Sequence, residues 1–165
     1  MKRLTVAKPL TRVAKITINH VVDEYPDISH LGHFSDTPGR FAIELGDGSD
    51  RTYRYFNAKN VADMTEARQN YERVQQFNSG ALVYYGIIAR AEILSLAGTD
   101  DLGRLSEVIR YVSSGGLWGI ESDSDEKYIH GIEQERIAEL RDILKKRGFS
   151  RNQFENAPVV KVAEP

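Results

Sequence analysis

Residues 113–148 read SSGGLWGIESDSDEKYIHGIEQERIAELRDILKKRG, and this stretch contains the clearest helix pattern of the chain. It joins a glycine-rich segment, the only tryptophan and an acidic cluster to an amphipathic helix expected from about Asp125 to Arg147. At about 100° per residue, its apolar side chains share one helix face, which must pack against another layer of the protein. They are Ile129, Ile132, Ile137, Leu140, Ile143 and Leu144.

Two charged residues, Glu133 and Arg136, project into this apolar stripe. Because they are three positions apart on a helix, they are expected to pair with each other, with their long side chains reaching water from a loosely packed turn. The alternative is that this turn faces a groove or a partner. Lys145, Lys146 and Arg147, followed by a glycine, predict the end of the helix.

The acids before the helix allow two interpretations. Asp123 with Glu126, or Ser122 with Asp125, matches a capping box, and carboxylates in a first turn interact favourably with the helix dipole. Alternatively, Glu121, Asp123 and Asp125 form a site for a hard cation such as Mg²⁺ or Ca²⁺. A phosphate site is excluded because these carboxylates would repel the anion.

Trp118 lies between glycines at the predicted corner from strand to helix. One interpretation is a core tryptophan that closes this corner. The other is a partly exposed anchor for a protein partner, since tryptophan is enriched at binding hot spots.

The rest of the chain predicts strands and one further helix. Residues 12–22 alternate, with Ala14, Ile16, Ile18, His20 and Val22 on the core face. A β-hairpin is expected over 41–55, with an Asp-Gly turn. A helix capped by Asn60 follows and ends at Ser79-Gly80. Residues 82–96 predict a central strand, and 104–112 its partner.

These elements predict the α+β class in a single domain over residues 1–165. The expected order is strand, β-hairpin, helix, strand, strand, helix, with a mostly antiparallel sheet of four to five strands and two amphipathic helices. The tail, residues 150–165, adds a short strand at 159–162 or lies along the surface.

Residues 23–40 are expected to form a polar loop, since two prolines and two glycines break any period. The loop contains His30 and His33, with Asp36 shortly after. Imidazoles and a carboxylate can ligate zinc or iron. A three-residue spacing fixes no geometry on a loop, so a solvated loop is preferred to a metal site.

The composition narrows the class of protein. The chain of 165 residues has a net charge of −2 and no cysteine. The absence of cysteine excludes disulfides, thiolate zinc sites and a cysteine nucleophile. The slightly negative net charge argues against direct nucleic-acid binding. Because no apolar run is long enough for a membrane span, a cytoplasmic protein with no membrane association is expected. No cofactor motif is present.

The tract GGLWGIESDSD at residues 115–125 resembles a family of uncharacterised small proteins of bacteriophages, prophages and mobile elements. The resemblance extends to YERVQQFNSG, YYGIIARAEI and EQERIAELRDILKKRGF. It implies a setting inside a bacterial host cell. By analogy, it implies a host or phage protein as partner, including a factor of host defence, as for anti-CRISPR-like antagonists.

We therefore expect a non-enzymatic accessory protein that binds another protein through an acidic surface. The candidate partner-binding residues are Trp118, Glu121, Asp123, Asp125, Glu133 and Arg136, and no catalytic or metal-binding residue is assigned. The alternative is a metal-dependent hydrolase or nuclease that uses the cluster of Glu121, Asp123 and Asp125. Self-assembly into a homo-oligomer is the third hypothesis.

Overall fold

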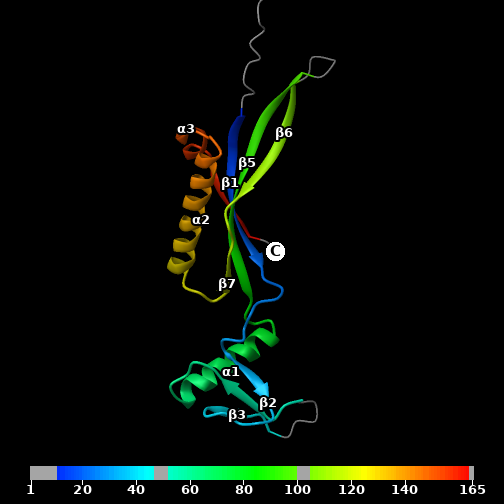
Figure 1. The fold of residues 1–165 in the computed structure, drawn as a ribbon, viewed down its shortest axis with the longest axis vertical. Helices are drawn as coiled ribbons and strands as arrows, with labels where there is room; N and C mark the ends of the chain where they lie inside the picture. The colour runs from blue at the N-terminus through cyan, green and yellow to red at the C-terminus, as the bar shows by residue number, and fades with distance from the viewer. Residues whose placement is uncertain (1–10, 47–51, 100–104, 164–165) are drawn as a thin grey trace, which may run out of the picture. The chain divides into compact units, whose positions relative to one another are not determined.

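The computed structural model describes residues 11–46, 52–99 and 105–163 (Figure 1). Within them it has eight strands and three helices in mostly antiparallel sheets, which confirms the α+β class. The chain forms two compact units. Unit 1 comprises Met1–Val22, Tyr85–Ile120 and Ser124–Pro165, and unit 2 comprises Asp23–Tyr84 and Glu121–Asp123. The single domain over 1–165 stays a prediction, and each unit is described separately.

The sheet of unit 1 has five strands in the order β6-β5-β1-β8, and β7 also pairs with β5. The strands are β1 (Thr11–Val22), β5 (Tyr84–Thr99), β6 (Leu105–Ser113), β7 (Leu117–Glu121) and β8 (Val159–Ala163). β5 is antiparallel to both β1 and β6, whereas β8 is parallel to β1. The expected central position of β5 is therefore confirmed. The turn expected after β5 lies partly outside the described residues.

The alternation of β1 changes once. The pairing with β5 shifts between Val13 and Lys15, which is a β-bulge. As a result Val13 is buried, whereas Ala14 was expected on the core face. From Ile16 onward the expected alternation is confirmed, and His20 lies on the same face as Ile16 and Ile18.

One face of this sheet is covered by α2 (Glu126–Lys146) and α3 (Arg151–Glu155) (Figure 1). The expected stripe of α2 packs on β1 and β5, with Ile132, Ile137 and Leu140 buried in the core. Asp125 is the N-cap of α2. Its carboxylate accepts hydrogen bonds from the backbone N–H groups of Lys127 and Tyr128. Both predicted capping boxes are therefore wrong.

The tail after α2 is structured. Gly148 has a φ of 90°, which ends the helix as its sequence indicated. α3, which the sequence analysis did not predict, follows and buries Phe154 in the core. The strand predicted at 159–162 is confirmed as β8, which pairs with β1 from Ile16 to His20.

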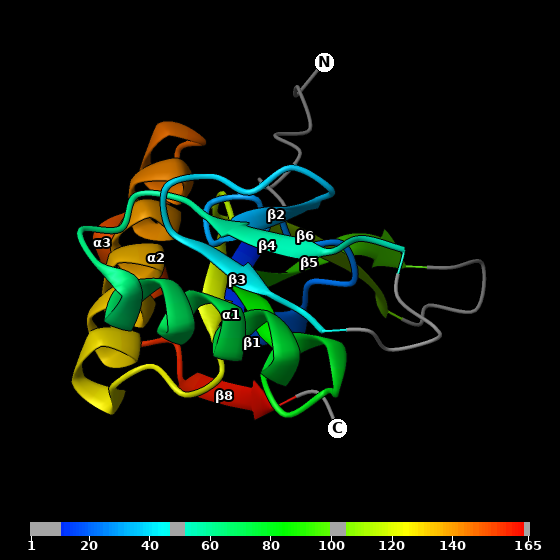
Figure 2. The same ribbon diagram turned by 90° about the horizontal axis from the view of Figure 1, so that it is seen from below.

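Unit 2 is a small sheet covered by one helix (Figure 2). Its strands are β2 (Gly32–Ser35), β3 (Ala42–Glu44) and β4 (Tyr55–Ala58) in the order β2-β4-β3, and its helix is α1 (Met64–Asn78). The predicted hairpin is confirmed by β3 and β4, although its turn at 47–51 lies outside the described residues. The loop prediction for 23–40 is wrong at β2, where Phe34 pairs with Phe56.

The start of α1 also differs from the prediction. The N-cap is Asp63, whose carboxylate accepts from the backbone of Thr65 and Glu66, while Glu66 accepts from the backbone N–H of Ala62. Asn60 lies before the helix with a φ of 55°. The prediction of a side-chain cap at the start of this helix is confirmed, but the capping residue is Asp63, three positions after the predicted Asn60. No helix among the described residues is long and apolar enough to cross a membrane.

Candidate functional site

Glu133 is the most deeply buried charged residue that the structure describes, at 1 % exposed. It lies on the face of α2 that packs against the sheet, because its position falls within the apolar stripe. Arg136 does not contact it: the guanidinium instead lies 2.8 Å from Glu139 Oε2. The predicted pair of Glu133 with Arg136 is therefore wrong, and Glu133 does not reach out to water.

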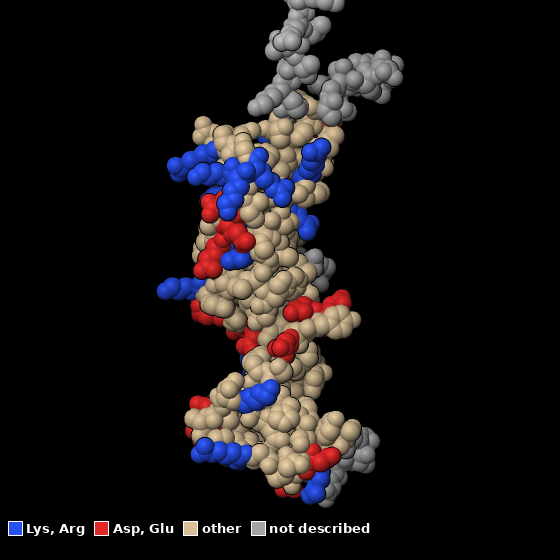
Figure 3. Space-filling view, viewed as in Figure 1, with Lys and Arg blue, Asp and Glu red and all other residues tan. Residues whose placement is uncertain are grey.

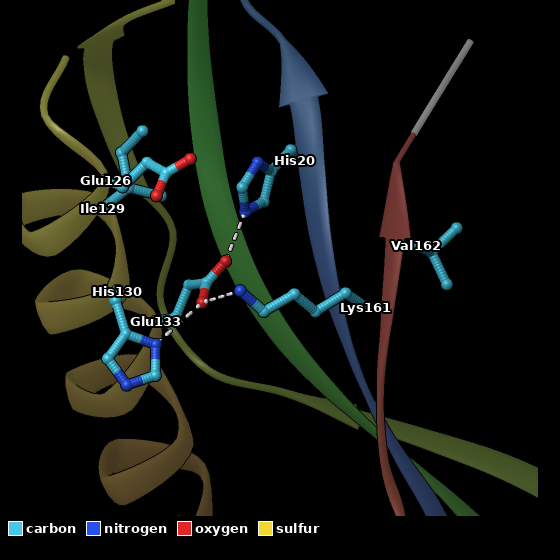
Figure 4. Close-up of a pocket in the computed structure, with 7 residues that line it drawn as sticks. All are labelled: His20, Glu126, Ile129, His130, Glu133, Lys161 and Val162. Atoms are coloured by element: carbon cyan, nitrogen blue, oxygen red, sulfur yellow. Dashed lines mark hydrogen bonds and ion pairs between the residues drawn. The ribbon is translucent and has the colours of Figure 1, made fainter.

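Three side chains from three elements surround the Glu133 carboxylate (Figure 4). His20 Nε2 on β1 lies 2.9 Å from Oε1. Lys161 Nζ on β8 lies 2.6 Å from Oε2, and His130 Nδ1, one turn earlier on α2, lies 3.5 Å from the same oxygen. The parallel pairing of β8 with β1 places Lys161 beside Ile18, on the face that α2 covers.

His20 is held on two sides. An ionised carboxylate only accepts hydrogen bonds, so Nε2 carries the hydrogen and, in the neutral ring, Nδ1 is left as an acceptor. The ring also stacks on Tyr85, with 5.1 Å between centroids and an interplanar angle of 9°. This geometry agrees with the core-facing position that the alternation of residues 12–22 predicts for His20.

The environment shifts two pKa values. Burial raises the pKa of Glu133, but the contacts with Lys161 and His20 outweigh it and hold the pKa below its ordinary value. Burial, together with the nearby Glu133 charge, raises the pKa of Tyr85. Glu133 is therefore an anion inside the protein at neutral pH.

The carboxylate forms part of the wall of an open pocket of about 460 Å³. Its other walls come from β1, β8 and the first two turns of α2, and in Figure 4 the two imidazoles and the Lys161 side chain converge on Glu133. The lining residues are His20, Glu126, Ile129, His130, Glu133, Lys161 and Val162. The arrangement can accept hydrogen bonds from a ligand and can neutralise a positive charge.

The acidic cluster has a different environment. In unit 2, Arg73 on α1 forms ion pairs with both Glu121 and Asp123, and its Nη2 lies 2.9 Å from Asp123 Oδ1. The hydrogen bonds to Asp123 and Glu121, with the charges of these carboxylates, raise the pKa of Arg73. The hydrogen bond from Arg73, with the charge of its guanidinium, lowers the pKa of Asp123. Tyr84 donates to Glu121 Oε1 at 2.9 Å, and burial with this bond raises the pKa of Tyr84 to about 12.

These contacts bear on both interpretations of the cluster. A guanidinium occupies the place between Glu121 and Asp123 that a cation would take, and Asp125 is the cap of α2. Across residues 11–46, 52–99 and 105–163, no three His, Cys, Asp or Glu side chains form a group suited to a metal ion. In the polar segment, His30 Nδ1 lies 3.2 Å from the Asp27 carbonyl oxygen, and Asp36 accepts from the backbone of Arg54.

Trp118 is not a core residue, because 48 % of it is exposed. A Cβ atom on Gly86 or on Gly116 would stand 2.6 Å from the indole, so these glycines allow the ring to lie flat against the sheet. Gly119 has a φ of 79°, which reverses the alternation of β7. Ile120 consequently enters the core, whereas Trp118 lies on the opposite face of the sheet from α2.

Sequence reasoning found part of the pocket. The interruption of the stripe singled out Glu133, whereas the alternation of β1 placed His20 on the core face without assigning it to a site. His130 and Lys161 were missed. The spacing of His130 and Glu133, three apart on a helix, was an available signal, whereas nothing local indicates that Lys161 reaches α2.

Comparison of the chain with protein-family models, with curated proteins and with solved structures finds no match. The resemblance to proteins of phages and mobile elements therefore stays a prediction.

Proposed function

We propose that the protein is an accessory factor that binds another protein through the open sheet face of unit 1. The open sheet face is the face opposite α2 and α3. Its exposed apolar and aromatic side chains are Ile109, Tyr111, Trp118, Val160 and Val162. The observation that carries the proposal is the half-exposed Trp118, held flat on a glycine-lined part of this face.

The strand register places these side chains together. Ile109 pairs with Leu94 and Tyr111 with Glu92, on the face that the core residue Ile93 does not share. On β8, Val160 and Val162 are partners of Thr17 and Asn19, which also point away from α2. A sheet face with exposed aromatic and aliphatic groups is typical of a protein-interaction surface.

Arg90 supports the same function. It lies on this face, 5.8 Å from the centre of the Tyr111 ring, in a cation–π arrangement. Arginine, tyrosine and tryptophan are the residue types most enriched at binding hot spots. By contrast, Glu121 and Asp123 already pair with Arg73, so an acidic surface has less support than it had from the sequence.

The partner class rests on the resemblance. A mobile-element protein inside a bacterium meets host proteins, and a factor of host defence fits the expected setting. No observation favours the alternative of a metal-dependent hydrolase or nuclease at Glu121, Asp123 and Asp125, since Arg73 takes their acceptor atoms.

The test is a pull-down from a bacterial lysate with mass spectrometry, followed by titration of the captured partner with purified variants. Trp118→Ala and Tyr111→Ala are expected to weaken the complex by about tenfold or more each, as for hot-spot residues. Tyr128→Ala is the matched control, because Tyr128 is 56 % exposed but lies on α2.

Full affinity of Trp118→Ala, or an equal loss in the Tyr128 control, would contradict the proposal. Light scattering tests the remaining hypothesis, which is self-assembly into a homo-oligomer. If the same variants dissociate a homo-oligomer instead of a heteromeric complex, the open sheet face serves self-assembly.

A further inference from the structure

We propose that the pocket around Glu133 is a binding site for an alkylammonium or guanidinium group, and that Lys161 occupies it as a built-in competitor. This inference is independent of the open sheet face, because the pocket lies on the side of the sheet that α2 covers. It rests on a buried carboxylate, a displaceable cation and the charge of the lining.

The acceptor is Oε2 of Glu133. A carboxylate has about four acceptor positions. Oε1 accepts from His20, whereas Oε2 is buried and faces Lys161 Nζ at 2.6 Å and His130 Nδ1 at 3.5 Å. A buried carboxylate oxygen carries a desolvation cost that a cationic N–H group offsets, so the site requires an ammonium or guanidinium at this oxygen.

The displaceable cation is Lys161. Its side chain is 64 % exposed although its partner carboxylate is buried. β8 is an edge strand, so the lysine leaves the pocket by rotating its own side chain, without breaking the sheet. In water the ammonium regains its full hydration, so another cation can replace it at small cost.

The lining favours a cation with an alkyl chain. The lining contains two carboxylates, those of Glu133 and Glu126, but only one lysine or arginine, Lys161. Ile129 supplies an apolar wall. Neutral imidazoles also accept hydrogen bonds from an ammonium. An anion would instead meet both carboxylates.

The two carboxylates suggest a ligand with two cationic groups. Glu126 and Glu133 are seven positions apart on α2, which places them on the same side of the helix at roughly 10 Å along its axis. An extended diamine can therefore approach both. The same chemistry is offered by a free diamine and by a lysine or arginine side chain of another protein.

The experiment measures binding of 1,5-diaminopentane and of n-butylammonium to the full chain by calorimetry at constant ionic strength. In Lys161→Ala the competitor is gone, and the diamine is expected to bind about tenfold more tightly than to the wild type, the value of roughly one charged hydrogen bond. Glu133→Gln in the Lys161→Ala background should lose this gain.

Lys15→Ala is the matched control. It removes a lysine that lies 3.2 Å from Glu92 on the open sheet face and does not line the pocket around Glu133. Its affinity for the diamine should equal that of the wild type. Equal gains in Lys15→Ala and Lys161→Ala would overturn the proposal, because they would report only a change in net charge.

A second measurement covers the case in which Lys161→Ala fails to fold. In the wild-type chain, addition of the diamine should shift the NMR signals of the His20 ring, while those of His33 in unit 2 stay unchanged. Unchanged His20 signals at saturating amine would refute the site. N-acetyl-lysine methylamide distinguishes the sources: binding of the free diamine alone indicates a small molecule, and binding of both indicates a protein side chain as well.

Discussion

Two carboxylate clusters of this protein differ in their burial and in the origin of their partners. In unit 2, Glu121 and Asp123 are partly exposed and share one guanidinium, that of Arg73. In unit 1, Glu133 is buried and draws its partners from two strands and its own helix. The two carboxylates of the first cluster are two positions apart in the sequence. The partners of Glu133 in the second cluster include His20 and Lys161, which are far from it in the sequence and reach it only in the folded protein.

An exposed run of acids and a single buried acid differ in the free-energy cost of holding their charge. A run of acids such as ESDSD is solvated, and its charges are inexpensive to hold. A single glutamate in an apolar stripe costs several kcal/mol if it is left unpaired, as a general estimate. The isolated residue is therefore the stronger sign of a site, although the run is more visible in the sequence.

The largest effect is expected when Glu133 loses its two closest partners. The double variant His20→Phe with Lys161→Met leaves the buried carboxylate without its hydrogen bond and its ion pair. The free energy of unfolding should fall by about 3–5 kcal/mol. Denaturant titration measures this change. Adding Glu133→Leu should restore most of the loss; if it does not, the charge of Glu133 is not the cause.

A medium effect on the stability of the fold is expected from a change in pH. The folded-state pKa of Glu133 lies below its ordinary value of 4.5, so its stabilising contribution is full above that value and is lost as the pH falls through the lower, folded-state pKa. The groups facing it are His20, Lys161, His130 and Tyr85.

Thermal unfolding between neutral pH and pH 3 tests this expectation. Glu133→Gln should make the melting temperature less sensitive to acid, because the titrating group is absent. Asp123→Asn should have the same direction of effect, since the pKa of Asp123 is also lowered, but at a lower pH range because its ordinary value is 3.8. An unchanged acid sensitivity in Glu133→Gln would contradict the ionised state.

The smallest effect is expected in the exposed cluster. Arg73→Met removes both ion pairs, yet the free energy of unfolding should fall by only about 1 kcal/mol or less, since partly exposed pairs contribute little. The loss should shrink further in high salt. A salt-independent loss as large as that of the double variant would remove the distinction between the clusters.

Local patterns predicted most of the elements. The period of residues 125–147 predicted α2, and the alternation of 12–22 predicted β1, because each element shows one face to the core. The errors have physical causes. Asn60 and Asp63 are equally good caps by type, and only the fold decides between them. Positive φ at Gly119 reverses the face of Trp118, and no pattern in the sequence indicates which glycine takes that conformation.

The candidate site was predictable only in part. His20 and Glu133 broke local patterns and could be singled out. Lys161 could not, because its role depends on the parallel pairing of β8 with β1. A short valine-rich segment predicts a strand but gives neither its neighbour nor its register.

That parallel pairing also bears on the order of events during synthesis. Ile16 and Val159, which are partners in the sheet, are separated by roughly 140 residues, so their contact closes a long loop and is expected to form late. Until β8 leaves the ribosome, one edge of β1 is open and the Glu133 carboxylate has no ammonium beside it. A nascent chain of this protein would therefore be a client for chaperones up to the moment at which its eighth strand emerges.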